Sequence, residues 1–286
     1  MSRPRATSDP SSIRYSAVYE RKRGWAPLNL RELWNFRELL YFLAWRDIKV
    51  RYKQAILGIG WVVLQPILMT GVFTVVFNVV LKIEGPEGLP YVVFVLSGLV
   101  VWQYFAAALS RCGVSLVGNS SILTKVYFPR LVVPIAPIFA GLVDLVIGLV
   151  ILGGLMAVYG IVPGWGTVFL PLLIILAMGT ALSVGLWLSA LYVLYRDVQY
   201  IIPFLIQIWM YVSPVIYPLD SIDNAALRVI FSLNPMTGVI DGFRWALLGQ
   251  RHPGSFLWVS VAIVIVLMVG GLYYFKRVEH VFADVI

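Results

Sequence analysis

Six apolar segments divide this chain, and each approaches the length of a helix that crosses a membrane. About 20 residues of helix are needed to cross the hydrocarbon core, and only the fifth segment is short. Hydrophobic residues make up 60% of the sequence and charged residues 13%, which leaves too few polar groups to cover a soluble globule of 286 residues. The sequence therefore predicts an all-α polytopic membrane protein with six transmembrane helices, at 59–81, 91–110, 131–159, 168–194, 201–217 and 257–275.

Lys and Arg residues lie mostly on one side of this series of spans. If the N-terminus is cytoplasmic, 18 of the 22 basic residues fall on the cytoplasmic side, twelve of them within residues 3–53. Cytoplasmic loops of membrane proteins carry the excess of Lys and Arg, so both termini are expected in the cytoplasm. Topology and attraction to anionic lipids account for the net charge of +8, and no nucleic-acid partner is expected. The basic residues left on the outer side are Lys82, Arg228, Arg244 and Arg251.

The chain before the first span divides into two parts. Residues 1–28 are basic, contain several Pro and Ser residues and lack the apolar core of a signal peptide, so a flexible arm is expected there. Residues 30–45 have an amphipathic helical pattern with Trp and Tyr at its boundary, which is typical of a helix lying along the inner membrane surface. A cytoplasmic helix packed on another soluble element is the alternative. Residues 29–286 are predicted to form one transmembrane domain.

Two spans carry residues that a purely lipid-facing helix would avoid. Gln65-Pro66 in the first span removes a backbone donor, which favours a protein-lined path. Asp144 in the third span is the only acid well inside any predicted span, and it shares a helix face with Ala140 and Gly148. An acid at that depth must be protonated, paired or hydrated. A hydrogen bond across helices, a place on a transport path and proton coupling are its three possible roles.

An outer region of about forty residues, 218–256, precedes the last span. Its two apolar runs, Ala225 to Leu233 and Val239 to Leu248, are interrupted by Asn234-Pro235. Each run is too short to cross the bilayer, so both are predicted to be interfacial or re-entrant helices on the outer face. A lid or gate and a passive outer cap remain equally open interpretations.

Catalytic or metal-binding patterns are sparse in this sequence. His252 and His280 are predicted on opposite membrane faces, and Cys112 is the single cysteine, so neither a metal cluster nor a Cys/His pair is expected. The phosphate-binding pattern G-x-x-x-x-G-K-[ST] does not occur. We therefore expect a chain that is not an enzyme and binds no cofactor or metal, with any ATP hydrolysed by another polypeptide.

Aromatic side chains are abundant instead, with 10 Trp, 15 Tyr and 15 Phe residues. Rings with polar edges suit a sugar chain, because its C–H faces stack on aromatic surface while its hydroxyls need hydrogen bonds. Contact with lipid is the common alternative for each ring. The predicted path residues are Trp61, Gln65, Phe73, Phe77, Trp102, Tyr104, Phe105, Trp209 and Tyr211.

Four stretches carry a more specific resemblance. Residues 46–66, RDIKVRYKQAILGIGWVVLQP, resemble the start of the membrane domain in bacterial ABC-type polysaccharide export permeases, which export O-antigen, capsule or teichoic acid chains. Residues 125–130 (KVYFPR), 195–198 (YRDV) and 233–237 (LNPMT) with Phe243-Arg244 are similar to further family stretches in the same order. The resemblance covers residues from about 29 to the end.

That resemblance implies a bacterial inner-membrane homodimer, two copies of a separate ATPase subunit that holds ATP and Mg, and a polyprenyl-linked glycan as substrate. Residues 30–45 would be the family's interface helix, and the aromatic spans would line a channel at the dimer interface. The implied coupling residues are Arg111, Lys125, Tyr127, Phe128, Arg130, Arg196 and Asp197. The implied outer gate residues are Asn234, Pro235, Phe243 and Arg244.

Other functions stay open on the sequence. An ABC permease for a small lipid or drug differs from a polysaccharide exporter only through these motifs and the aromatic supply. An ion-coupled secondary carrier would need ionisable groups at the midplane, where only Asp144 is found. A membrane-embedded glycosyl- or acyltransferase would depend on the outer residues Asp220, Asp223, Asp241 and His252.

Overall fold

Helices form the architecture of this protein, seen in a computed structural model that describes residues 30–53, 58–83, 85–86, 88–219 and 224–282. Within these ranges, five helical segments are long and apolar enough to cross a membrane, and a sixth apolar helix, Val198–Tyr211, is shorter. No strand occurs in the described ranges. The prediction of an all-α polytopic membrane protein is confirmed. The predicted arm, 1–28, lies outside the described residues.

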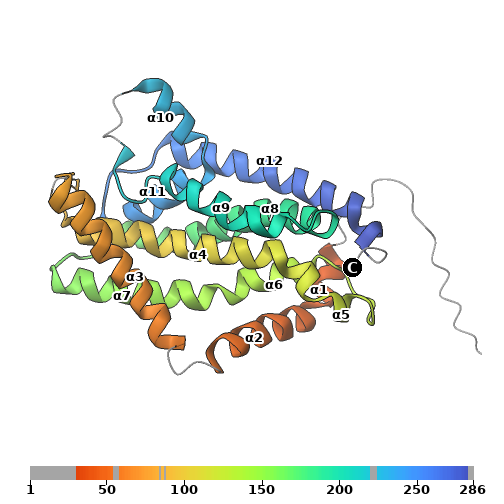
Figure 1. Cartoon of the computed structure of the whole chain (residues 1–286). Coiled ribbons are helices and arrows are strands. Elements are labelled where there is room, and N and C mark those ends of the chain that lie inside the picture. The colour runs from red at the N-terminus through yellow and green to blue at the C-terminus, as the bar shows by residue number, and fades with distance from the viewer. Residues whose placement is uncertain (1–29, 54–57, 84, 87, 220–223, 283–286) are drawn as a thin grey trace, which may run out of the picture.

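The helices follow one another along the chain with short connections (Figure 1). They are α1 (Leu30–Asn35), α2 (Arg37–Lys53), α3 (Gly58–Phe73), the π-helical η1 (Thr74–Val80), α4 (Tyr91–Gly118), α5 (Ser120–Leu123), α6 (Val132–Ala140), α7 (Leu142–Val158), the 3₁₀ helix η2 (Trp165–Phe169), α8 (Leu170–Leu194), α9 (Val198–Tyr211), α10 (Ala225–Ser232), α11 (Pro235–Leu248), α12 (Ser255–Val278) and the 3₁₀ helix η4 (Glu279–Val281).

The central helix of the bundle is α4, which packs against α3, α6, α7, α8, α9 and α11. Its closest approach to α8 needs a glycine, because a Cβ on Gly185 would lie 2.4 Å from the Cys112 sulfur. In an apolar 18-residue stretch of each span, 78% is buried in α4, but only 11% is buried in the span formed by α3 and η1. The span containing α3 therefore covers one flank of the bundle and leaves most of its own surface uncovered.

Two predicted span limits are wrong, and the third span keeps its predicted limits but is interrupted. The second span ends at Gly118 instead of residue 110, so Arg111 lies within the helix. The third extends from Val132 to Val158, close to the predicted limits, and is divided at Gly141 into α6 and α7. The fifth runs from Val198 to Tyr211, because the chain turns before Pro214 and is no longer helical.

The predicted interface helix forms, but it is longer than expected and is divided at Phe36 into α1 and α2. Helix α2 packs on α6 through Leu43 and Ala44. Both side chains are buried in a hydrophobic cluster that is separate from the main core and also holds Phe128 and Phe275, here called the second hydrophobic cluster. Because it continues to Lys53, α2 brings its last turn to the side of the bundle where α3 begins (Figure 1). Its location along the inner membrane surface stays a prediction.

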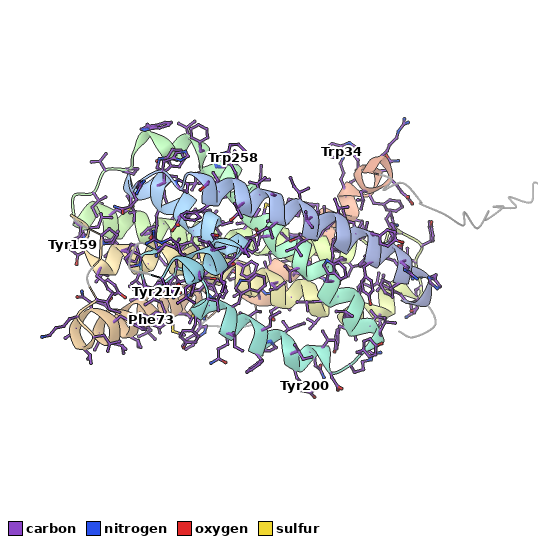
Figure 2. All side chains as sticks on the ribbon, turned by 90° about the horizontal axis from the view of Figure 1, so that it is seen from above. Trp34, Phe73, Tyr159, Tyr200, Tyr217 and Trp258 are labelled. Carbon is purple, nitrogen blue, oxygen red and sulfur yellow. The ribbon has the colours of Figure 1, made fainter. Side chains whose placement is uncertain are left out.

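The two ends of the bundle differ in the elements they present. Helices α1 and α5 and the end of α12 share one end, whereas α10 and the end of α7 lie at the other (Figure 1). Exposed aromatic side chains occur toward both ends, Trp34 toward the first and Tyr159 at the second (Figure 2). Aromatic rings at both ends are typical of the two water interfaces of a membrane protein.

Candidate functional site: a cavity beside the first span

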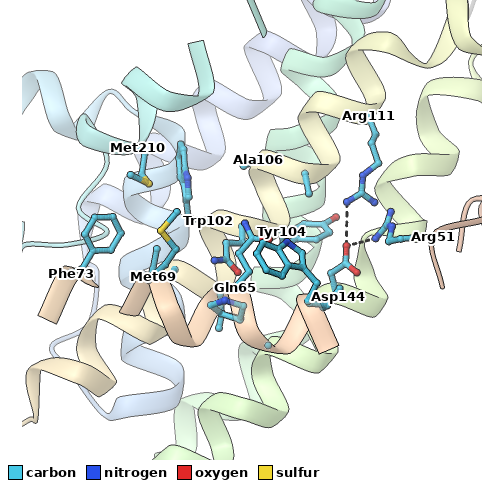
Figure 3. Close-up of a pocket in the computed structure, with 18 residues that line it drawn as sticks. Arg51, Gln65, Met69, Phe73, Trp102, Tyr104, Ala106, Arg111, Asp144 and Met210 are labelled. Carbon is cyan, nitrogen blue, oxygen red and sulfur yellow. Dashed lines mark hydrogen bonds and ion pairs between the residues drawn. The ribbon is translucent and has the colours of Figure 1, made fainter. Parts of the chain in front are cut away.

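A cavity of about 820 Å³ lies between α3, α4 and α7, and the last turn of α2 and Met210 of α9 complete its wall (Figure 3). Phe73 and Met210 mark one end of the cavity, and Asp144 with Arg51 and Arg111 marks the other. Its volume is in the range of ligand-binding pockets, which are typically 300–1,000 Å³. The uncovered span containing α3 forms one side of a space large enough for part of a large ligand.

Five of the nine predicted path residues line this cavity. Their rings and amide combine apolar surface with hydrogen-bonding groups along α3 and α4. Gln103 also lines it and was missed, although a polar residue inside a predicted span is a signal for a buried or functional position. The five residues are Trp61, Gln65, Phe73, Trp102 and Tyr104.

The other four predicted path residues lie elsewhere. Phe105 is fully buried between α4 and α9, with its ring centroid 5.1 Å from that of Trp209. Phe77 packs edge-on against Phe73 at 6.0 Å, which supports the cavity wall from behind. Tyr211 is 54% exposed at the end of α9. Packing explains the positions of Phe77, Phe105 and Trp209 without contact to a ligand.

Asp144 connects three helices at one end of the cavity. Its carboxylate accepts hydrogen bonds from Arg51 and Tyr52 of α2 and from Arg111 of α4, the last at 3.3 Å (Figure 3). Burial and then the neighbouring carboxylate raise the pKa of Tyr52 to about 12, so the phenol remains a neutral donor at physiological pH. Asp144 therefore makes hydrogen bonds across helices, which is one of its three predicted roles, and it also lines the cavity.

Arg111 is the clearest correction to the predicted coupling residues. It was expected at the start of a cytoplasmic loop, but it lies inside α4, seven residues before Gly118, and faces Asp144. Arg51 was counted only as a cytoplasmic charge, yet it forms the other ion pair of Asp144. An acid inside a span needs a cationic partner, and that requirement was the signal that could have identified Arg51.

The remaining predicted coupling residues lie at the end of the bundle that carries α5. Lys125 and Tyr127 are exposed after α5, and Arg196 and Asp197 are exposed in the turn before α9. Phe128 is buried in the second hydrophobic cluster. The coupling set therefore divides into four surface side chains and others that support the fold.

Arg130 belongs to the supporting group. Its guanidinium donates a hydrogen bond to the backbone oxygen of Glu279 and lies 5.8 Å from the centroid of the Phe282 ring. These contacts fix the loop after α5 to the C-terminal end of α12. A substitution of Arg130 would therefore disturb packing as well as any surface contact.

Asn234 joins the start of α11 to the end of α9. Its side-chain oxygen accepts hydrogen bonds from the Met236 amide, which caps α11, and from the Trp209 indole at 2.8 Å. Its side-chain nitrogen donates to the Val212 carbonyl and the Ser213 hydroxyl. The predicted break at Asn234-Pro235 is confirmed, because Pro235 is the first residue of α11 and Asn234 is its N-cap.

Arg244 was expected to face the outer side, but only 3% of it is exposed. Its guanidinium donates to the carbonyls of Pro214, Val215 and Phe94, at 2.6, 2.8 and 3.4 Å. It also lies 3.6 Å above the Phe94 ring centroid. Burial lowers the pKa of Arg244 to about 10, so it stays charged at neutral pH. Phe243 is fully buried too, so both predicted gate side chains hold α11 against the bundle.

No group of three or more His, Cys, Asp and Glu side chains in the described ranges is placed to hold a metal ion. The cavity's charged lining residues are Arg51, Arg111 and Asp144. Within the described residues, the chemistry this cavity offers is stacking, hydrogen bonding and ion pairing.

Comparison with known proteins gives consistent similarities. Residues 38–248 match the family described as ABC-2 type transporter. The chain is 30% identical over 257 residues to the O-antigen export system permease protein RfbA of Myxococcus xanthus, covering 89% of this chain and 98% of that protein. It is 27% identical to the protein of the same name from Klebsiella pneumoniae, covering 87% and 95%. It is 24% identical to the polysialic acid transport protein KpsM of Escherichia coli, covering 82% and 91%.

Proposed function

Because the chain belongs to the ABC-2 type transporter family, we propose that it is the transmembrane permease subunit of an ATP-driven exporter that moves a lipid-linked polysaccharide out of the bacterial cytoplasm. The relatives named for O-antigen export and polysialic acid transport support a polysaccharide as the cargo. The observation that carries the proposal is the cavity beside α3, where Trp61, Trp102 and Tyr104 lie with glutamine amides. Stacking rings beside hydrogen-bonding amides suit a glycan, which needs both.

Energy for transport comes from a separate ATPase subunit in this proposal. The sequence has no phosphate-binding loop of its own, and the matched family is that of a transporter domain. Lys125, Tyr127 and Arg196 are exposed at the end of the bundle that carries α5 and the end of α12. The positive-inside pattern puts this end in the cytoplasm, where it can contact a nucleotide-binding partner.

A second copy of the chain completes the transport path. Only 11% of the apolar stretch in the span containing α3 is buried. Gln65 in this span lines the cavity and is also exposed. Lipid tails alone would leave that amide without hydrogen-bond partners, which is costly in a membrane. A partner copy packed against α3 encloses the cavity in a homodimer in the inner membrane.

A transport assay tests the role of the cavity. The chain and its ATPase are co-purified, reconstituted in vesicles and supplied with polyprenyl-linked glycan. Trp61→Ala should lower ATP-dependent glycan transport about 2- to 10-fold at unchanged protein level, the range expected for losing an aromatic stacking contact. Trp258→Ala is the matched control, because Trp258 is 70% exposed on α12, away from the cavity. Equal effects of the two substitutions, or stimulation by small amphiphiles and not by glycan, would contradict the proposal.

The ATPase contact is tested at the loop after α5. Lys125→Glu reverses an exposed charge there, and it should abolish glycan-stimulated ATP hydrolysis while leaving membrane insertion unchanged. Arg251→Glu makes the same charge reversal at an exposed position beyond α11, and it should leave hydrolysis unchanged. Normal stimulation in the Lys125 variant would remove this loop from the coupling contact.

A further inference from the structure

The charges around Asp144 do not balance. Arg51 and Arg111 both pair with this one carboxylate, which leaves a formal charge of +1 at that end of the cavity. The cavity has no further charged lining residue among those the structure describes. The side chains of Arg51, Arg111 and Asp144 are partly exposed, at 20%, 34% and 17%. A net positive charge in a partly desolvated space attracts an anion more strongly than the same charge in water.

Arg111 has donor capacity that its surroundings do not use. Its Nη1 atom is buried and has no hydrogen-bond partner among the described residues, and Nη2 makes a long contact of 3.3 Å with Asp144. An unsatisfied donor on a buried charged group is costly, so it normally indicates a missing acceptor. Because a third of the Arg111 side chain is exposed and lines the cavity, rotation about its terminal torsions brings the guanidinium to an acceptor there.

The groups beside these arginines define the kind of ligand. Gln103 and Gln65 line the same cavity, and Met69 and Phe73 continue from Gln65 toward its other end (Figure 3). Two guanidinium forks match a tetrahedral oxyanion, which offers more acceptor oxygens than a carboxylate and can carry two negative charges. A dianion can therefore compete with the single charge of Asp144 for the two arginines.

We propose that Arg51 and Arg111 bind the phosphate or diphosphate ester of an isoprenyl lipid at this end of the cavity, with Asp144 as the competing internal anion. The ester is the group that joins the glycan to its lipid, so its identification with the cargo rests on the proposed function. The site itself rests on the charge imbalance and on the unpaired donor of Arg111. Without ligand, Asp144 forms ion pairs with both arginines, and when the ester binds, one or both of these ion pairs break.

The test measures equilibrium binding of tritiated farnesyl diphosphate to the full chain in phosphatidylcholine nanodiscs. Arg111→Gln should weaken binding about 10- to 100-fold, the range for losing charge-assisted hydrogen bonds. Asp144→Asn should strengthen binding, because it removes the competing charge, and a misfolded chain could not produce that gain. Arg277→Gln is the matched control, since Arg277 is exposed at the end of α12 outside the cavity. Protection of buried Cys112 from a maleimide checks that each variant is folded.

The arms of this experiment separate the possible sources of the anion. Competition by unlabelled farnesyl diphosphate, but not by farnesol or inorganic diphosphate, supports an isoprenyl ester. Equal competition by inorganic diphosphate would show that the arginines bind a free anion. Displacement of farnesyl diphosphate by phosphatidylglycerol in the nanodiscs would show that they bind ordinary lipid. Either result overturns the proposal. So would unchanged binding in Arg111→Gln or a loss in Asp144→Asn, which would leave the cluster as a structural link between α2, α4 and α7.

Failure of this proposal is distinguishable from failure of the proposed function. Transport of glycan with no effect of Arg111→Gln on farnesyl diphosphate binding would leave the exporter intact and remove only this site. Binding that follows the expected order of variants, in a complex that transports no glycan, would keep the site and remove the polysaccharide as cargo.

Discussion

Replacing Arg244 with Ala should destabilise the part of the protein around α11 by about 3–5 kcal/mol. The segment after α9 is not helical, so the carbonyls of Pro214 and Val215 have no helical donors, and Arg244 supplies them. The same side chain bonds the Phe94 carbonyl on α4 and covers its ring. The substitution removes this donor from the Pro214 and Val215 carbonyls, whereas the Phe94 carbonyl keeps the Ser97 hydroxyl at 2.7 Å.

The magnitude follows from these contacts. An unsatisfied buried acceptor costs about 1–3 kcal/mol, and a desolvated cation–π contact adds about 2 kcal/mol. The sum exceeds the net loss, because the substitution also removes the cost of burying a charge. At about 1.4 kcal/mol per tenfold change, a loss of 3–5 kcal/mol raises the opened population roughly 100- to 4,000-fold.

The single cysteine makes this effect measurable. Cys112 is fully buried between α4 and α8, so a fluorogenic maleimide reacts with it only after these helices separate. A Val215→Cys reporter in a Cys112→Ser chain reports opening of the held segment itself, since Val215 is fully buried. When reclosing outpaces the chemistry, the labelling rate is proportional to the opened population.

Two controls separate the cause of the effect. Arg244→Lys keeps the charge but loses the planar fork, so its labelling rate should lie between those of the parent and Arg244→Ala. Arg251→Ala removes an exposed arginine on the same outer side and should change the rate less than threefold. If the Val215→Cys reporter in the Arg244→Ala chain reacted within threefold of its parent, the three hydrogen bonds would not hold this segment and the reasoning would be refuted.

Three further predictions use the same labelling or melting measurements. Gly98→Ala should destabilise the protein by about 1–3 kcal/mol, because a Cβ there would lie 2.9 Å from the Arg244 guanidinium. Gly153→Ala is the control, since a Cβ there meets open space and should be neutral or stabilising. Equal melting temperatures of the two variants would refute the steric argument. Asn234→Asp keeps the cap of α11 but loses both side-chain donors, so it should cost about 1–3 kcal/mol, and a chain as stable as the parent would contradict that role. In intact cells, an impermeant maleimide should label Val162→Cys and spare Val126→Cys, both exposed at opposite ends of the bundle; the reverse pattern would invert the topology.

Sequence patterns predicted the features of this fold that depend on local chemistry. The apolar segments became helices because only intrahelical hydrogen bonds satisfy the backbone in a membrane. The break at Asn234-Pro235 was predictable, since an Asn cap followed by Pro at the first helical position is a local start signal. The end of α9 was missed although Pro214 is a local signal for it, because the residue before a proline disfavours the helical conformation. What the sequence could not show is that the distant Arg244 donates to the Pro214 and Val215 carbonyls there.

Contacts between distant segments were what the sequence could not supply. Arg111 was placed in a loop because charge normally marks the end of a span, but pairing with Asp144 stabilises the charge inside the helix. Composition likewise could not distinguish the role of Phe105, which fills the core, from that of Trp102, three residues earlier in the sequence, which lines the cavity. Helical faces become distinguishable only when the neighbouring helices are placed.

The contrast in packing between α3 and α4 indicates which elements can move during transport. Gly185 and Cys112 bring α8 so close to α4 that sliding between them is sterically opposed, whereas α3 touches the bundle along one narrow face. Helix α2 begins at the end of the bundle that carries α5 and finishes at Arg51 beside Asp144. A displacement of α2 would therefore change the partners of Asp144 directly. We expect α4, held in place by α8, to act as the fixed wall of the cavity, with α2 and α3 as its movable side.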